Sequence, residues 1–164
     1  MQYTYSYSSP LGEMLIASDG SAVTGLWFIG QKYFGSTLEA EYAEKALPVF
    51  GQTVRWLDDY FQGNVPMEMP PVSFNSSSFR IRVWKLLMEI PYGHTVTYGE
   101  IARTLEKQTG RRICAQAVGG AVGHNPVSII VPCHRVIGSN GLTGYAGGLD
   151  KKLALLRLEG VNVH

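Results

Sequence analysis

Residues 77–105, SSFRIRVWKLLMEIPYGHTVTYGEIARTL, decide the fold of the second half of this chain. The serines at the start can cap a helix, and an apolar stripe at helical spacing runs from Phe79 to Ile90. The Pro-Tyr-Gly that follows ends this helix. Thr97, with Glu100 three residues later, is typical of a capping box that begins a second helix.

A further helix is predicted beyond this stretch, after a turn near Gly110. Residues 111–122 are rich in small side chains and begin with two arginines. Two short helices joined by a tight turn, the second basic at its start, indicate a helix-turn-helix. A last helix is predicted over about residues 149–158.

The first half has a different pattern, in which apolar and polar residues alternate. Alternation over residues 3–7, and apolar runs at 14–17 and 23–28 separated by turn residues, predict a three-stranded antiparallel meander. Apolar side chains then recur at helical spacing over residues 48–62. This helix should cover one face of the sheet.

The two halves differ in charge as well as in pattern. Residues 1–75 carry three basic and eight acidic side chains, whereas residues 76–164 carry eleven basic and five acidic ones. Residues 63–73 contain three prolines and are typical of a linker. We therefore predict domains at 1–73 and 74–164, with a polyanionic partner for the second.

Composition restricts the class of protein. The chain has no run of 18 apolar residues, and its start lacks the basic and apolar regions of a signal peptide, which predicts a soluble protein of the cytoplasm without membrane contact. Its two cysteines, Cys114 and Cys133, are too few for a zinc site without histidines, and a structural disulfide is not expected in a reducing compartment. We expect no metal and no cofactor.

Residues 128–137, SIIVPCHRVI, carry the candidate chemistry. The β-forming residues predict a buried strand, with Pro132 ending regular pairing and presenting Cys133. A thiol beside an imidazole can become a nucleophilic thiolate, and His134 follows directly. Glu159 is the best candidate to orient this histidine. The alternative is a thiol that simply packs in the core beside a structural histidine.

The motifs around Cys133 resemble those of the O6-alkylguanine-DNA alkyltransferases, also called methylated-DNA–protein-cysteine methyltransferases. The resemblance covers roughly residues 74–161, and the motifs occur in the order of the family. They are Ile90–Gly93, Thr97–Ala102, Ala117–Val122, Asn125–Val127, Val131–Val136, Gly144–Gly148 and Leu158–Gly160.

The resemblance implies a role for each matching residue. Cys133 would be the alkyl acceptor, His134 the base acting through water, and Glu159 its partner. Asn125 would order the backbone ahead of the active-site strand and hydrogen-bond near the thiol. Tyr98 would donate a proton to guanine N3 as the base leaves.

The resemblance also implies a pocket for an extruded nucleotide. Tyr145 would line the alkyl pocket. Backbone groups of Cys133, Val136 and Ala146 would read the guanine edge.

The second helix of the helix-turn-helix is expected to enter the minor groove of DNA, largely without sequence preference. Small residues allow close approach, and nearby arginines can contact phosphates. Gln116 stands where many relatives have the arginine finger that fills the gap left by the flipped base, and we expect weaker DNA affinity as a result. The predicted DNA-contacting set also contains Arg111, Arg112, Ala115, Ala117, Gly119, Gly120 and Arg135.

The resemblance thus implies an α+β protein that repairs DNA. An N-terminal antiparallel sheet with a helix, RNase H-like or ferredoxin-like, would precede a mainly helical winged-helix domain with a helix-turn-helix. A monomer would bind double-stranded DNA containing O6-alkylguanine and transfer the alkyl group to Cys133, irreversibly and once. The alternatives are an alkyltransferase-like lesion binder, a winged-helix regulator with a structural thiol, and an unrelated Cys-His hydrolase.

Overall fold

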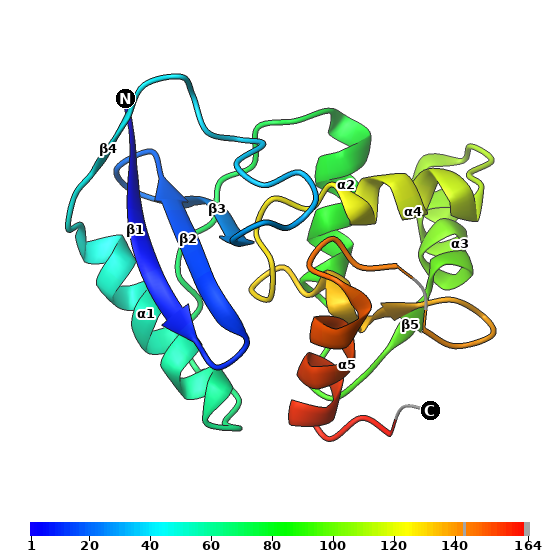
Figure 1. Cartoon of the computed structure of the whole chain (residues 1–164). Helices are drawn as coiled ribbons and strands as arrows, with labels where there is room; N and C mark the ends of the chain where they lie inside the picture. Colours follow the sequence, from blue (N-terminus) through cyan, green and yellow to red (C-terminus); the bar gives the residue numbers. More distant parts are fainter. Residues whose placement is uncertain (143, 163–164) are drawn as a thin grey trace. The chain divides into compact units, whose positions relative to one another are not determined.

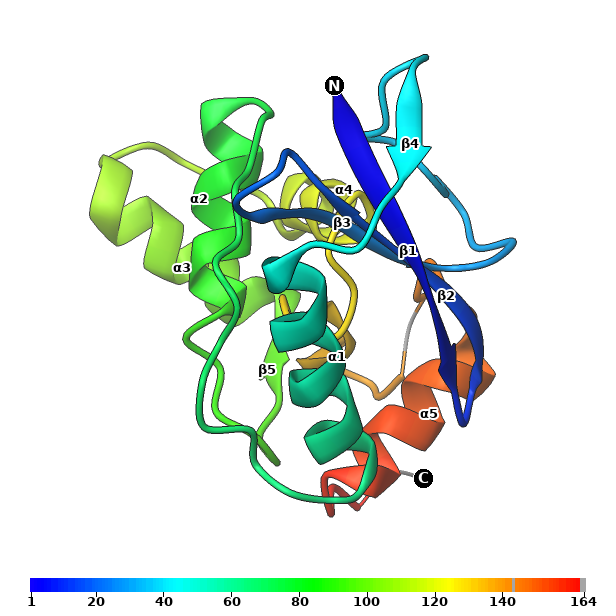
Figure 2. The same ribbon diagram turned by 90° about the vertical axis from the view of Figure 1, so that its left-hand side faces the viewer.

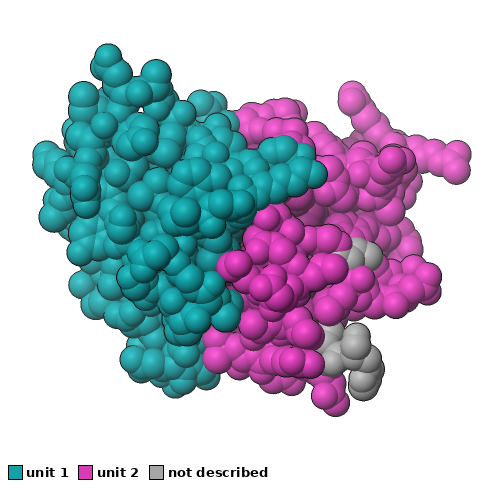
Figure 3. All heavy atoms as spheres, viewed as in Figure 1, with its two compact units in different colours: residues 1–75, 126–128 teal, residues 76–125, 129–164 magenta. Residues whose placement is uncertain are grey.

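The computed structural model describes residues 1–142 and 144–162 and divides the chain into two compact units. Unit 1 comprises Met1–Asn75 and the short segment Pro126–Ser128, and unit 2 comprises Ser76–Asn125 and Ile129–His164 (Figure 3). The division falls two residues beyond the boundary predicted from sequence. No pattern in the sequence indicated that residues 126–128 belong to unit 1.

A four-stranded sheet in the order β3-β2-β1-β4 forms the centre of unit 1. Neighbouring strands of the predicted meander pair antiparallel, and β4 pairs parallel to β1. β4 was missed because its three residues are not apolar enough to produce an alternating pattern. The strands are β1 (Gln2–Ser9), β2 (Gly12–Ser18), β3 (Val23–Phe28) and β4 (Tyr42–Glu44).

Helix α1, Pro48–Phe61, lies along one face of this sheet (Figures 1 and 2). It begins with a proline, whose fixed φ suits the first helical turn. Tyr5 of β1 stacks on Phe50 at a centroid distance of 5.7 Å. The apolar stripe predicted over 48–62 therefore faces the sheet, as its helical spacing requires.

The outer edge of β3 is occupied by two short segments of unit 1. Val23 pairs with Val72, and Leu26 pairs with Val127, both in parallel orientation. Residues 126–128, which make the second pairing, come shortly before Cys133 in the chain.

Unit 2 is mainly helical, which confirms the predicted α+β class. The side chain of Ser77 accepts from the Arg80 amide and that of Thr97 from the Glu100 amide, as the capping patterns indicated. A two-stranded parallel sheet, β5 with β6, lies beside the helices (Figure 1). The elements are α2 (Ser78–Leu87), β5 (Val96–Thr97), α3 (Tyr98–Thr109), α4 (Ala115–Gly123), the 3-10 turn η1 (Cys133–Arg135), β6 (Val136–Ile137) and α5 (Leu149–Leu158).

Two predictions of local structure were wrong. The helix predicted over 111–122 begins at Ala115, with Cys114 as its N-cap. Residues 128–131 do not form a strand: they are buried turns, and Ile129 has φ of +69°, which no β-strand residue adopts. Burial of this run was confirmed, because an apolar sequence favours burial but does not choose between a strand and a turn.

No helix within residues 1–142 and 144–162 is both long and apolar enough to cross a membrane.

Gly25 of β3 provides a test of packing in unit 1. A Cβ there would lie 2.0 Å from Cη2 of Trp27, whose side chain is fully buried. We expect Gly25→Ala to lower the free energy of unfolding by about 2 kcal/mol or more, because the ring has no room to move. Gly51→Ala on α1 is the matched control: the nearest atom to its Cβ is Arg55 Nη1 at 3.5 Å, and alanine favours helix. Equal unfolding midpoints for the two variants in urea would contradict this account.

Candidate active site

Cys133 begins the turn η1, directly after the buried run that ends at Pro132. Only 6% of the residue is exposed. Burial raises the pKa of the Cys133 thiol, whereas a hydrogen bond from the Asn125 side chain and the charge of Lys152 act in the opposite direction. Burial of Cys133 therefore disfavours the reactive thiolate, whereas Asn125 and Lys152 favour it.

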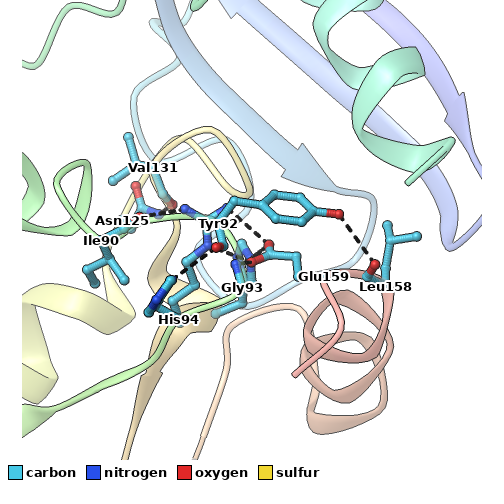
Figure 4. Close-up of polar contacts among 10 residues, drawn as sticks. Ile90, Tyr92, Gly93, His94, Asn125, Val131, Leu158 and Glu159 are labelled. Carbon is cyan, nitrogen blue, oxygen red and sulfur yellow. Dashed lines mark hydrogen bonds and ion pairs between the residues drawn. The ribbon is translucent and has the colours of Figure 1, made fainter. Parts of the chain in front are cut away.

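Asn125 connects the start of the active-site segment to its end. Its Nδ2 donates to the Val131 carbonyl at 2.8 Å, as drawn in Figure 4, and its side chain also bonds to Cys133. The residue is buried, at 5% exposure. Asn125 thus contacts both the buried run ahead of the thiol and the thiol itself.

A buried network holds His134. Its Nε2 lies 2.6 Å from Glu159 Oε2, and neither side chain is exposed. Arg135 donates to the same carboxylate through Nε, at 2.8 Å, and through Nη2, at 3.1 Å. The Gly93 amide donates to Glu159 Oε1 at 3.0 Å, and Arg135 Nη1 donates to the Ile90 carbonyl at 2.7 Å (Figure 4 labels Gly93, Ile90 and Glu159).

This network determines which nitrogen of His134 is basic. The carboxylate accepts a proton on Nε2, so Nδ1 is the atom that can take up another. Burial lowers the pKa of His134, and the contact with Glu159 opposes that change. A neutral imidazole with a fixed tautomer is the form that a general base requires.

Arg135 does not lie where a DNA-contacting residue would. It is 8% exposed, its guanidinium engages Glu159, and it stacks over the Tyr92 ring at 5.7 Å. The Tyr92 hydroxyl in turn donates to the Leu158 carbonyl at 3.3 Å (Figure 4). The DNA-contacting role predicted for Arg135 is therefore not supported, because its charge is used inside the unit to position the carboxylate.

Lys152 lies near Cys133 and was not among the site residues predicted from the sequence. It is fully buried, and its Nζ donates to the carbonyls of Val136, at 2.6 Å, and Gly144, at 3.3 Å. Burial lowers the pKa of Lys152 to about 8, and the nearby Cys133 opposes that change. A signal did exist: Lys152, Leu155 and Glu159 follow helical spacing on α5, so the buried stripe includes two charged residues.

The remaining residues of the predicted base pocket lie in unit 2. Tyr98 is half-buried at the start of α3, and a Cβ on Gly119 would lie 3.9 Å from its ring. Tyr145 and Ala146 are half-buried in the loop ahead of α5. Val136 is fully buried, and its carbonyl already accepts from Lys152.

Helix α4 has an inner and an outer face. Val118, Ala121 and Val122 are buried, and Trp84 Nε1 of α2 donates to the Ala121 carbonyl at 2.8 Å. The outer face is small and uncharged, with Gln116 as its largest side chain. Among the predicted DNA-contacting residues at and before this helix, Gly119 is half-buried, and the others are exposed: Arg111, Arg112, Ala115, Gln116, Ala117 and Gly120.

Neither cysteine is in a disulfide; Cys114 is exposed and Cys133 is buried. Among the described residues, no group of three or more His, Cys, Asp and Glu side chains is arranged to hold a metal ion.

The comparison with known protein families agrees with this site, in which a buried thiol lies beside a histidine held by a carboxylate. Residues 78–161 match the DNA-binding domain of 6-O-methylguanine DNA methyltransferase, and residues 1–70 match its ribonuclease-like domain. The chain belongs to this family.

Relatives align over nearly the whole chain. A methylated-DNA–protein-cysteine methyltransferase of Mycobacterium leprae is 42% identical over 160 residues, which are 97% of this chain and 93% of the relative. One from Haemophilus influenzae is 40% identical over 97% of this chain and 86% of the relative. The crystal structure of Mycobacterium tuberculosis OGT in complex with DNA superposes with a TM-score of 0.82, at 41% identity, over 96% of this chain and 92% of that one.

Lys152 should control the ionisation of Cys133. In a Cys114→Ser background, we expect Lys152→Met to raise the pKa of Cys133, because the buried cation that favours the thiolate is lost. Iodoacetamide should then alkylate Cys133 about tenfold more slowly at neutral pH, which corresponds to roughly one pKa unit. The difference should vanish above about pH 8, where Lys152 loses its own charge.

Lys151→Met is the matched control for this experiment, since it removes the neighbouring charge from the same helix. If both variants follow the rate–pH profile of the parent, Lys152 has no electrostatic role.

Proposed function

We propose that this protein repairs DNA by transferring the alkyl group of O6-alkylguanine to its own Cys133. The observation that carries the proposal is the buried thiol followed by a histidine whose Nε2 lies 2.6 Å from the Glu159 carboxylate. Membership of the 6-O-methylguanine DNA methyltransferase family supports the substrate. The relative solved in complex with DNA supports the partner.

The transfer is a direct displacement at the alkyl carbon. His134 takes the thiol proton through a bridging water at Nδ1, and Glu159 stabilises the imidazolium that forms. The Cys133 thiolate attacks the alkyl carbon, an S–C bond forms, and the C–O6 bond breaks. Tyr98 donates a proton to guanine N3, which stabilises the leaving base. The thioether has no route back to a thiol, so each molecule reacts once.

The buried thiol requires an extruded nucleotide. Cys133 is 6% exposed, so a lesion stacked within a duplex cannot reach it, and the nucleotide must rotate out of the helix. Tyr145 and Ala146 line the pocket that receives the base, together with the backbone of Val136. Asn125 keeps the segment ahead of the thiol in place.

Helix α4 is the DNA-binding element in this proposal. Its outer face carries the small residues Ala115, Ala117 and Gly120, so the backbone can approach the minor groove closely. This face has few side chains that could hydrogen-bond to base edges. Arg111 and Arg112 contact phosphates, so binding is nearly independent of sequence and falls with salt.

All the groups in this mechanism come from one chain, so a monomer suffices. We place the protein in the cytoplasm, where a free thiol such as Cys133 remains reduced.

Intact mass tests the transfer. Incubation with DNA containing O6-methylguanine should add about 14 Da to each chain, since one CH2 is gained when S–H becomes S–CH3. Cys114→Ser should form the adduct normally, and Cys133→Ser should form none. Binding without an adduct would indicate a lesion-binding protein, and repeated turnover would indicate a hydrolase.

Gln116 tests the DNA-binding face. Gln116→Arg should tighten binding to duplex DNA and increase the slope of log affinity against log salt by about one, because one more cation displaces one counterion. Gln116→Ala should bind more weakly and transfer more slowly, whereas the control Gln108→Ala on α3 should leave both unchanged. Parent-like binding by Gln116→Ala would remove Gln116 from the mechanism.

A further inference from the structure

A small cavity of unit 2 lies between the end of α2, the turn that follows it, β5 and the start of α3, all of which can be found in Figure 1. Every residue that lines it belongs to unit 2, so the cavity lies within one compact unit. Its volume is about 240 Å³. Sites for drug-sized ligands have roughly 300–1,000 Å³, so this cavity suits a smaller molecule.

The lining combines an apolar interior with an acidic rim. Two exposed glutamates form part of the rim: Glu89 directly follows the end of α2, and Glu100 is in the first turn of α3. The apolar side chains are buried or half-buried, and they are Leu86, Ile90, Val96 and Ile101.

The two carboxylates have no partner within unit 2. Basic side chains outnumber acidic ones by eleven to five over residues 76–164, yet among the residues that the structure describes neither Glu89 nor Glu100 has a hydrogen bond or an ion pair at its carboxylate. The Glu100 carboxylate does not even reach the Thr97 amide, which a complete capping box would give it. The rim therefore presents two uncompensated negative charges beside an apolar surface.

This lining favours an organic cation over a metal ion. Ca²⁺ takes six to eight oxygen ligands and Mg²⁺ six, whereas the cavity offers two carboxylates and the Thr104 hydroxyl, which already donates to the Glu100 carbonyl at 3.1 Å. The apolar interior offers no ligand to an inorganic ion, but it gains free energy when hydrocarbon covers it. A ligand with ammonium groups on an alkyl chain matches both parts of the lining.

We propose that this cavity is a binding site for a small aliphatic diamine. One ammonium group lies against Glu89 and the other against Glu100, and the hydrocarbon chain between them covers the apolar interior. Both amines are protonated at neutral pH, as a lysine side chain is, so two positive charges meet two negative ones.

The site is separate from the groups proposed for alkyl transfer. Tyr98 faces α4, since a Cβ on Gly119 would lie 3.9 Å from its ring. Glu100 is two residues further along α3, which places it about 200° around the helix from Tyr98. Diamine binding therefore goes beyond the proposed function and does not depend on it.

Titration of the ¹⁵N-labelled chain with putrescine, a diamine with four carbons, tests the site in the absence of DNA and at constant ionic strength. The amide signals of Ile90, Val96 and Ile101 should shift and saturate at one equivalent per chain. Butylamine should bind about fivefold more weakly, because it lacks one ionic contact. Butanediol, which has the same chain and no charge, should cause no shift.

Variants of the two glutamates test their part. Glu89→Gln and Glu100→Gln should each weaken putrescine binding about fivefold, because each removes one ionic contact. Glu106→Gln is the matched control: it removes an acidic charge from the same helix α3, outside the cavity, and should leave the affinity within about 1.5-fold of the parent. Thermal melting checks that all three variants remain folded.

Shifts that do not saturate, or equal weakening by all three substitutions, would show that putrescine is only a diffuse counterion and would overturn the inference. Equal affinity for butylamine and putrescine would also overturn it, since the cavity would then fit a single alkylammonium group such as a lysine side chain. Neither result would affect the proposed alkyl transfer, which the intact-mass experiment tests separately.

Discussion

The buried carboxylate of Glu159 is the constraint on which the reactive region depends. It terminates α5 and receives His134 and Arg135 from η1 and the Gly93 amide from the turn ahead of β5. Three segments far apart in sequence are thus held by one group. Removing one partner of a buried ion pair lowers the stability of the fold by about 3–5 kcal/mol, because the remaining charge is left uncompensated. Substitution of Glu159 or Arg135 alone would therefore also disturb His134.

Helix α5 supplies two opposite charges to the proposed reaction. Lys152 and Glu159 are seven residues apart, on the same buried side of the chain. Passage of the thiol proton to the imidazole creates an anion at Cys133 and a cation at His134. Each new charge has an opposite charge already in place, so little reorganisation accompanies the transfer. The arrangement gives a physical reason for burying a lysine, which is otherwise unfavourable.

Local signals predicted much of this molecule. Helix caps at Ser77 and Thr97 depend on neighbouring residues only, so the starts of α2 and α3 were visible in the sequence. The start of α4 was not, because its N-cap, Cys114, makes no side-chain capping bond. Cys133, His134 and Glu159 were proposed from the residue pattern before the family resemblance was considered, and Asn125 was named through that resemblance. Lys152 was overlooked, because lysine and arginine side chains on a helix are usually exposed, as Arg157 of α5 is.

By itself the sequence determined the α+β class and the capped helices of the second half, since both reside in short-range patterns. Only the tertiary structure decided that residues 128–131 turn instead of forming a strand, that Arg135 faces inward, and that Pro126–Ser128 pairs with Leu26. The reason is physical. An apolar run favours burial in any conformation, whereas its conformation depends on hydrogen-bond partners from elsewhere in the chain. One of these is Leu26, whose carbonyl accepts from the Ser128 amide about a hundred residues away.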